Sequence, residues 1–295
     1  MISTPIPRWA QGACPGGAVA GVRAAWGFTH ETWILATSNG PAVAVQRRRD
    51  RSDPTRPRSR AIREAVRAAG LLVPEPSGAP PDRGHAVVVL PFVSGAPAAE
   101  LLHGADGAEA AGVLGGRVAA RLAGIAWGGL GLPSTWASGE RLRTAGRDWA
   151  RRCAGSLRER SLGTIETLLE GAAGEVDDAS GRFAHGDLAP VNILVRRGRV
   201  AAILDVAAIL DLDRARVAHP LYDAAWFAWV VTHHHPQVAD AAWRGYARGA
   251  GLPPQTPAAF AWIQPLQLLE RAATARTRSE REAWATRLEA ALDAR

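Results

Sequence analysis

The chain has 295 residues, of which 47% are hydrophobic and 21% are charged, and this globular composition excludes wholesale disorder. No apolar run is long enough to span a membrane, the first residues lack the layout of a signal peptide, and Cys14 and Cys153 are too few for a disulfide framework. We therefore expect a cytoplasmic protein with reduced thiols and no membrane partner, although its net charge of +7 raises the question of nucleic acid.

The positive charge comes from one residue type. The sequence contains no lysine, so all 35 basic residues are arginine. The densest basic run, residues 46–60, has no aromatic side chain that could stack on bases, and its Arg- and Pro-rich composition is typical of a solvated loop. These features disfavour a nucleic-acid partner, while the excess charge would still attract an anionic nucleotide.

The first part of the chain combines strand patterns with one helix. Residues 20–46 alternate in the manner of strands around a turn at SNGP, and residues 59–70 form a helical pattern that ends at Gly70. The apolar run HAVVVLPFV, residues 85–93, predicts a buried strand. The sequence SGAP then interrupts the pattern, and we place a domain boundary near Ser94.

Helical patterns dominate the rest of the chain. They cover residues 108–127, 138–160 and 163–176 and return from residue 219 to the end, with a short β interlude at residues 182–205. This order predicts an α+β protein with a small β-rich lobe, residues 1–94, and a larger, mainly helical lobe, residues 95–295. Two such lobes favour a ligand cleft between them.

The chemistry is concentrated in HGDLAPVNIL, residues 185–194. Asp187 precedes Asn192 by five residues, and a further aspartate closes the following strand. Phosphoryl transfer needs such groups, since one carboxylate orients the attacking hydroxyl while amide and carboxylate oxygens hold Mg²⁺ against the phosphates. The sequence lacks paired cysteines and an HExxH motif, which argues against zinc.

HGDLAPVN, followed by ILDLDRARVAHPLYDAAW, resembles the signature of the aminoglycoside phosphotransferase and choline kinase family. The resemblance implies a bilobal protein-kinase-like fold, with the first lobe binding nucleotide and the second binding the acceptor. It also implies that Asp187 is the catalytic base, that Asn192 and a later aspartate bind Mg²⁺, and that His185 is structural.

The first lobe resembles the family more loosely. AAWGFTHETWIL is similar to the nucleotide-binding hairpin, where Gly27, Thr29 and His30 match the positions over the phosphates. The run VVVLPFV, which contains Val89, would supply the backbone edge for the adenine ring.

AVAVQRR resembles the strand that carries the family's phosphate-binding lysine, but Gln46 stands at the lysine spacing and Arg47 follows. Strand alternation puts Val43 and Val45 on the core face and therefore points Gln46 into the cleft. The need for a cation favours Arg47 instead, and a β-bulge would reconcile the two arguments. We favour Arg47, with Glu64 on the helix as its partner.

The second metal ligand has two candidates, because the sequence VAAILD occurs twice in succession and each copy ends in an aspartate, Asp205 or Asp211. Asp205 lies 13 residues after Asn192, the spacing that the family shows for a tight hairpin. Asp211 is followed by LDRARVAHPLYDAAW, the context that the family shows downstream. In a continuous strand the two would be about 20 Å apart, so both cannot bind one ion. We favour Asp211, because a hairpin loop absorbs extra residues at low entropic cost.

These observations predict a Mg²⁺-dependent kinase that transfers the γ-phosphoryl group of ATP or GTP to the hydroxyl group of a small molecule. The acceptor would be an antibiotic or a metabolite such as an amino alcohol or a sugar. The alternative is a pseudokinase, a nucleotide-binding regulator without turnover, because the lysine is missing and the metal-binding strand is duplicated.

Overall fold

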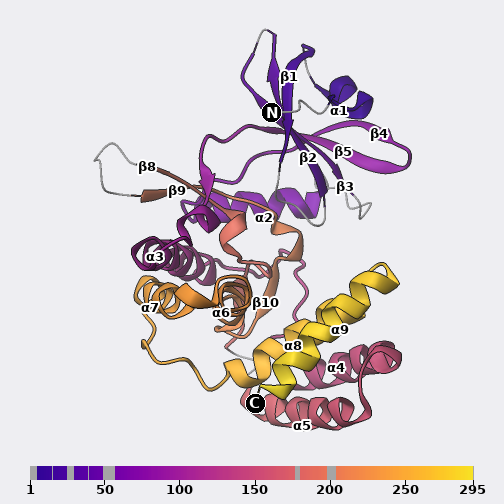
Figure 1. Ribbon diagram of the computed structural model, residues 1–295, viewed down its shortest axis with the longest axis vertical. Coiled ribbons are helices and arrows are strands. Elements are labelled where there is room, and N and C mark those ends of the chain that lie inside the picture. The colour runs from indigo at the N-terminus through magenta and orange to yellow at the C-terminus, as the bar shows by residue number, and fades with distance from the viewer. Residues whose placement is uncertain are drawn as a thin grey trace. The chain divides into compact units, whose positions relative to one another are not determined.

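The computed structural model describes residues 5–14, 16–24, 30–38, 40–48, 57–176, 180–197 and 204–294 (Figure 1). The chain divides into two compact units. The first consists of Met1–Ala98 and Val191–Asp213, and the second of Ala99–Pro190 and Arg214–Arg295. The hairpin that follows Asn192 therefore groups with the first unit, although the sequence assigns it to the helical lobe.

The first unit is built on a five-stranded antiparallel sheet with the order β1-β2-β3-β5-β4. Its strands are β1 (Ala18–Arg23), β2 (His30–Thr37), β3 (Val43–Arg48), β4 (Ser77–Asp82) and β5 (His85–Pro91). Helix α2 (Pro57–Ala68) follows β3, and the turn after it contains Gly70, whose φ of 77° is a left-handed conformation that glycine adopts without strain. The predicted strand-helix-strand order of this region is confirmed.

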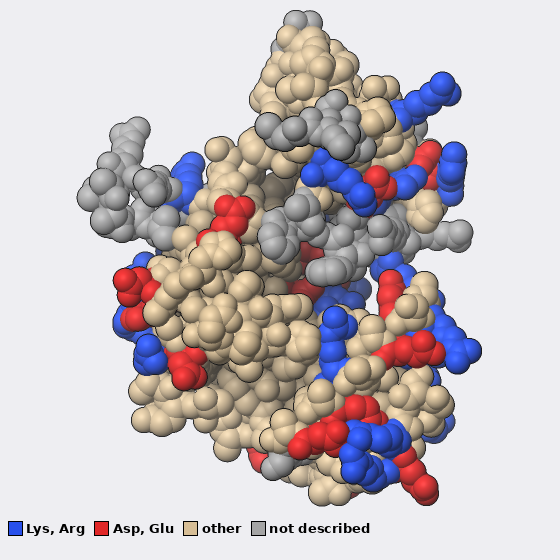
Figure 2. All heavy atoms as spheres, viewed as in Figure 1, with Lys and Arg blue, Asp and Glu red and all other residues tan. Residues whose placement is uncertain are grey.

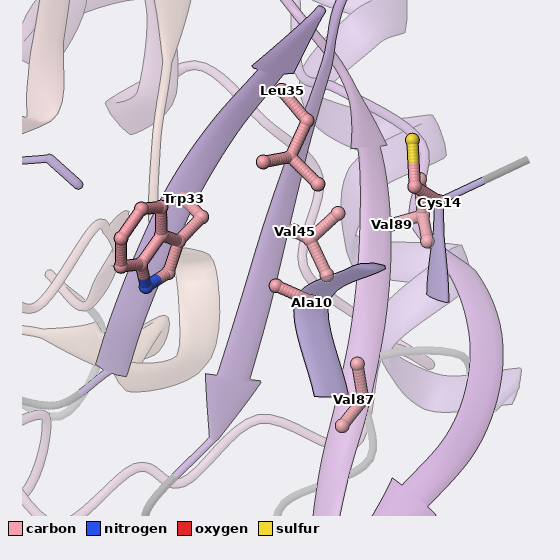
Figure 3. Close-up of a cluster of buried hydrophobic side chains, with 7 residues drawn as sticks. All are labelled: Ala10, Cys14, Trp33, Leu35, Val45, Val87 and Val89. Carbon is pink, nitrogen blue, oxygen red and sulfur yellow. The ribbon is translucent and has the colours of Figure 1, made fainter. Parts of the chain in front are cut away.

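One face of this sheet packs on the short helix α1 (Arg8–Ala13) (Figure 3). Trp33, Val45 and Val89 lie side by side on β2, β3 and β5, and each is at most 6% exposed. Because side chains alternate along a strand, Gln46 lies on the opposite face from Val45, and Arg47 lies on the same face as Val45.

A second sheet of the first unit contains the doubled VAAILD segment. It has the order β6-β8-β9, formed by β6 (Ala96–Pro97), β8 (Ile193–Arg197) and β9 (Leu204–Ile209). Strands β8 and β9 form an antiparallel hairpin in which Ile193 pairs with Ile209 and Arg196 pairs with Asp205. An irregularity between Leu194 and Val195 shifts the register by one residue.

The second unit is mainly helical and contains a small sheet. The two strands, β7 (Arg182–Ala184) and β10 (Arg216–Ala218), pair antiparallel. The helices are α3 (Ala105–Ala123), α4 (Gly139–Cys153), α5 (Glu159–Glu175), α6 (Tyr222–His234), α7 (Ala239–Ala250), α8 (Phe260–Ala273) and α9 (Arg278–Asp293). The helical stretch predicted for residues 138–160 is interrupted by a 3₁₀ turn, Ala154–Ser156, and by the extended residue Leu157, so that it forms α4 and the start of α5.

Helices α3 and α7 make the closest helix–helix contact of this unit, and glycines permit it. A Cβ atom at Gly112 or Gly116 would lie 2.0 or 2.2 Å from a carbonyl oxygen of α7. A Cβ atom at Gly245 or Gly249 would meet a carbonyl oxygen of α3 at 2.1 or 2.2 Å. The contact is therefore reciprocal, with a glycine pair four residues apart on each helix letting the backbones touch.

Aromatic side chains fill the space between the other helices of the unit. Trp136 is fully buried, with its ring 4.9 Å from that of Tyr222 and 6.5 Å from that of Trp262. Within the described part of the chain, no helix has both the length and the apolar character needed to cross a membrane.

Candidate active site

The loop His185–Asp187 follows β7, and its shape requires a glycine in the middle. Gly186 has a φ of 81°, and a Cβ atom at this position would lie 2.0 Å from the carbonyl oxygen of Arg214. Any other residue would be strained both by the backbone conformation and by this contact. The glycine of the HGD motif thus serves the geometry of the loop that presents Asp187.

Asp223, at the start of α6, holds this loop in place. Its two carboxylate oxygens accept hydrogen bonds from the backbone N–H groups of His185 (2.7 Å) and Gly186 (3.0 Å). His185 is fully buried, and its Nδ1 accepts a hydrogen bond from the N–H of Asp187 at 3.3 Å. Burial raises the pKa of the Asp223 carboxyl, while His185 and the two backbone donors favour its charged form. His185 therefore has a structural position, as the family resemblance implies.

The carboxylate of Asp187 is held by two donors from distant helices. The Nε1 of Trp226 on α6 and a guanidinium nitrogen of Arg271 on α8 both donate to its Oδ1, at 2.7 and 2.8 Å. Burial raises the pKa of Asp187, but the nearby guanidinium groups of Arg271 and Arg214 outweigh burial and lower it below the ordinary value. With its side chain 21% exposed, Asp187 is an ionised carboxylate that a ligand can reach.

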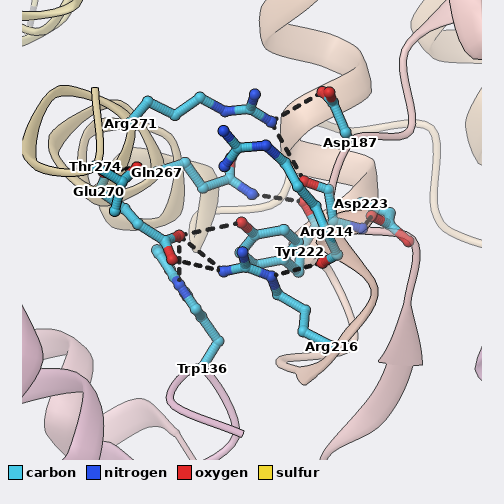
Figure 4. A network of polar contacts seen from close by, with 11 residues as sticks. Trp136, Asp187, Arg214, Arg216, Tyr222, Asp223, Gln267, Glu270, Arg271 and Thr274 are labelled. Carbon is cyan, nitrogen blue, oxygen red and sulfur yellow. Dashed lines mark hydrogen bonds and ion pairs between the residues drawn. The ribbon is translucent and has the colours of Figure 1, made fainter. Parts of the chain in front are cut away.

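A wider polar network supports these contacts (Figure 4). The guanidinium of Arg271 packs 3.8 Å from the centre of the Trp226 ring, so both donors to Asp187 fix each other. The neighbouring Glu270 accepts two hydrogen bonds from Arg216, at 2.9 and 2.8 Å, and one from Trp136 at 3.0 Å. The carboxylate oxygens of Glu270 are therefore occupied by donors within the protein.

The two residues whose hard-oxygen side chains are predicted to bind metal have adjacent backbones at the base of the β8–β9 hairpin. The N–H of Leu210 donates to the carbonyl oxygen of Asn192 at 2.9 Å, so Asp211 is one residue from a backbone pair with Asn192. Asp211 has a φ of 59°, a left-handed conformation that is uncommon for residues other than glycine. The backbone of Asp205 instead lies opposite that of Arg196 in the β8–β9 ladder, further along the hairpin. The structure thus brings Asp211, and not Asp205, next to Asn192.

Comparison with known proteins identifies the family. The profile of the phosphotransferase enzyme family matches residues 21–262. The chain belongs to the phosphotransferase enzyme family. A search of the curated proteins finds no match.

Solved phosphotransferases share the fold. An amicoumacin kinase in complex with AMP-PNP, Ca²⁺ and Ami is similar with a TM-score of 0.62 at 12% identity, over 93% of this chain and 88% of that one. An aminoglycoside-3′-phosphotransferase of type VIII has a TM-score of 0.55 at 21% identity, over 87% and 94%. A macrolide 2′-phosphotransferase from Brachybacterium faecium has a TM-score of 0.54 at 19% identity, over 91% of each chain. The chain therefore has the bilobal kinase-like fold.

Gln46, which stands at the spacing of the family's phosphate-binding lysine, and its neighbour Arg47 lie on opposite faces of the sheet. Arg47 lies on the α1 face of the sheet, where it forms ion pairs with Glu31 (2.6 Å) and Asp82 (2.8 Å). Its guanidinium also lies 5.1 Å from the centre of the Trp9 ring. The need for a cation favours Arg47 over Gln46 as the phosphate-binding residue. In the structure, however, Glu31 and Asp82 from other strands already balance the charge of Arg47.

Two further expectations for the first unit need correction. Glu64 is exposed, and within the described residues the partners of Arg47 are Glu31 and Asp82, so the predicted pair of Arg47 and Glu64 does not form. Val89 lies inside the sheet between Val45 and Ser77, so its backbone is not a free edge for an adenine ring. The buried charged residue of α2 is Arg63, which pairs with Glu75 at 2.9 Å.

The remaining candidates belong to the hairpin that is predicted to bind the nucleotide. Gly27 and Thr29 fall outside the described residues, and of His30 only the backbone, at the start of β2, is described. Their predicted roles stay predictions.

Sequence reasoning missed Arg271 and the part of Trp226 in the site. They lie 84 and 39 residues from Asp187 in the sequence. Arg271 belongs to no motif, and Trp226 is the last residue of HPLYDAAW, which by itself does not indicate a contact with Asp187. A weak signal was present, since an arginine within the apolar pattern of α8 has to find a buried anion.

Charge is distributed rather than concentrated on the face of the molecule drawn in Figure 2. Blue arginine side chains there alternate with red acidic ones and do not form one continuous stripe. Opposite charges also pair between α4 and α5, where Arg147 forms an ion pair with Glu166.

Proposed function

We propose that this phosphotransferase transfers the γ-phosphoryl group of ATP or GTP to a hydroxyl group of a small molecule. The observation that carries the proposal is the state of Asp187, an ionised, accessible carboxylate whose loop is clamped by Asp223 and whose oxygen is fixed by Trp226 and Arg271. A group prepared in this way is suited to receive the hydrogen of an acceptor hydroxyl.

In the reaction, Asp187 accepts a hydrogen bond from the acceptor hydroxyl and aims its oxygen at the γ-phosphorus. A bond forms between this oxygen and phosphorus, the bond from phosphorus to the bridging oxygen breaks, and the nucleoside diphosphate leaves. The proton of the hydroxyl passes to a carboxylate oxygen of Asp187. Because the pKa of Asp187 is lowered, the residue is a weak base, which suits a loose transition state in which the proton moves late.

Asn192 and Asp211 would hold the metal ion. Their amide and carboxylate oxygens are hard ligands of the kind that Mg²⁺ prefers, and their backbones are adjacent at the base of the hairpin. The left-handed backbone of Asp211 supports this role, because strained residues concentrate at ligand sites. When bound, Mg²⁺ would neutralise charge on the phosphate oxygens.

The acceptor would meet an aromatic surface next to Asp187. The ring of Trp226 stacks on Trp229 at 5.1 Å and lies 6.2 Å from Trp284, and both of these partners are partly exposed. Such a surface suits an acceptor with a ring, and both an antibiotic and a metabolite such as a sugar fit this description. Burial of both free thiols, Cys14 and Cys153, fits a protein of the reducing cytoplasm.

A pseudokinase is the second candidate, and a specific observation favours it. Gln46 occupies the position of the phosphate-binding lysine, and Arg47 is neutralised by Glu31 and Asp82. A protein of this kind would bind a nucleotide without transferring its phosphoryl group.

The test is a screen for phosphate release and for a mass increase of the acceptor, with ATP and with GTP, against panels of antibiotics and hydroxylated metabolites. Asp187→Ala should lower transfer by about 1,000-fold or more, because it removes the group that orients the hydroxyl, while nucleotide binding persists. If the wild type binds nucleotide but transfers phosphoryl to no compound, the pseudokinase is the better description.

A further inference from the structure

A kinase must neutralise the negative charge of the phosphoryl group that it transfers, and this chain can do so only with arginine, histidine or a metal ion, since it has no lysine. On strand β3, Gln46 is uncharged and Arg47 is already engaged by Glu31 and Asp82. An arginine beside Asp187 is in a position to contact the phosphoryl group that the acceptor hydroxyl attacks.

Arg214 is a cation that its surroundings leave without a direct partner. It is partly buried, yet its guanidinium forms no hydrogen bond and no ion pair with any residue in the described part of the chain. Its carbonyl oxygen, by contrast, accepts a hydrogen bond from Arg216 at 3.1 Å and fits against Gly186. The backbone of Arg214 is thus fixed against the catalytic loop, while the charged end of its side chain has no hydrogen-bond or ion-pair partner among the residues that the structure describes.

The charges nearby explain why this guanidinium would bind an anion. Figure 4 shows it beside the guanidinium of Arg271, and this neighbour is the largest cause that lowers the pKa of Arg214 below its ordinary value. The carboxylate of Asp187 lies close enough to interact with both cations, but it forms its ion pair with Arg271. Glu270 is likewise engaged by Arg216. Two arginines thus share one available carboxylate, and an additional anion would relieve their repulsion.

We propose that Arg214 binds the phosphoryl group during its transfer and supplies positive charge beside Asp187. The inference rests on the proposed function, because it takes Asp187 as the residue that holds the acceptor hydroxyl. The attacked phosphorus lies one bond from that hydroxyl oxygen at the moment of transfer. A guanidinium next to Asp187 can therefore donate two hydrogen bonds to the phosphoryl oxygens, where negative charge is concentrated.

An anionic group carried by the acceptor would have the same chemistry as a phosphoryl oxygen, and binding measurements separate the two sources. The probes are the nucleoside diphosphate and the β,γ-imido triphosphate of whichever nucleotide the wild type uses. If Arg214 binds the γ-phosphoryl group, Arg214→Ala should reduce the preference for the triphosphate analogue about tenfold or more, and leave diphosphate binding nearly unchanged.

Turnover should follow the same pattern. Arg214→Ala is expected to lower kcat about 100-fold, and Arg214→Lys, which keeps the charge but loses the planar fork, should lower it less. The matched control is Arg248→Ala, since Arg248 is an exposed arginine of α7 that pairs with Glu109. Melting temperatures of all variants exclude unfolding as the cause, and Arg214→Lys carries the comparison if Arg214→Ala does not fold.

Three outcomes overturn the inference. Arg214→Ala could match Arg248→Ala in kcat and in triphosphate preference, which would leave Arg214 with no role in phosphoryl binding. It could raise the acceptor KM with unchanged triphosphate preference, which would assign the anion to the acceptor. A wild type that neither binds nor hydrolyses nucleotide would instead refute the proposed function itself.

Discussion

Asp187 owes its properties to side chains that lie far from it in the sequence. Trp226 and Arg271 donate to the same carboxylate oxygen, Oδ1, at 2.7 and 2.8 Å. A carboxylate that accepts these two hydrogen bonds cannot rotate freely, so its approach to an acceptor hydroxyl is defined before the substrate arrives. Arg271 is therefore a positioning residue as well as the nearest source of positive charge.

The charge of Arg271 predicts a change in the pH profile. The pKa of Asp187 is lowered in the folded protein, so the carboxylate stays ionised as the pH falls and loses its charge only below the ordinary range. Arg271→Met should raise this pKa and move the acidic limb of the kcat profile to higher pH, whereas Arg271→Lys should leave the limb near its wild-type position. The measurement is kcat from pH 4 to pH 8.

The same shift contributes to stability, with a defined sign. A depressed carboxyl pKa stabilises the folded protein above the unfolded-state pKa, and this contribution is lost as the pH falls through the folded-state value.

The pH profile of kcat also has a contradicting outcome. If Arg271→Met lowers kcat at every pH and leaves the acidic limb in place, Arg271 acts only by packing on Trp226.

At the scale of elements, the β8–β9 hairpin decides which aspartate can join Asn192. The register Ile193 to Ile209 brings the end of the second VAAILD copy to the base of the hairpin and leaves Asp205 opposite Arg196. Asp211→Asn should therefore abolish most of the Mg²⁺-dependent activity, and Asp205→Asn should retain it. Titration of Mg²⁺ against activity and against nucleotide binding tests both variants.

Loss of the Mg²⁺-dependent activity in Asp205→Asn but not in Asp211→Asn would contradict the choice of Asp211 as the metal ligand. A deletion of residues 200–205 provides a second check. It removes one whole copy and leaves the other at the spacing of a tight hairpin, so the shortened protein should keep its metal dependence.

Elements defined by local sequence could be predicted, and features that join distant segments could not. The HGD loop, the strand alternation around Val45 and the helices are all encoded within short windows of sequence. The partners of Arg47 come from β2 and from Asp82, and Arg271 reaches Asp187 from α8. An argument from charge alone favoured Arg47 because it could not include the carboxylates that the sheet brings beside it.

At the scale of the whole molecule, stability depends on the contact between α3 and α7. The glycines at 112, 116, 245 and 249 bring carbonyl oxygens of each helix to within 2.2 Å of the site of a missing Cβ atom. A side chain there would push apart two backbones and not merely a flexible neighbour. The small size of these four glycines therefore sets the distance between the axes of α3 and α7.

Gly116→Ala should consequently destabilise the protein by about 3 kcal/mol and lower its Tm by about 6–10 °C. Gly171→Ala in α5 is the matched control, because a Cβ atom at Gly171 meets nothing within 4 Å. The control should be neutral or stabilising by up to about 1 kcal/mol, since alanine favours a helix over glycine. Calorimetry compares the two, and equal Tm values would refute the steric argument.

The doubled segment carries the sequence of the proposed metal-binding strand twice. The observed register uses Ile209, and Ile203 is its equivalent in the first copy. A slip by one whole copy would keep every apolar side chain on its face of the hairpin and would offer Asp205 in place of Asp211. A substitution at Asp211 leaves the register of the hairpin unchanged, so Asp205 could take the place of Asp211 only in a hairpin that has slipped by a whole copy.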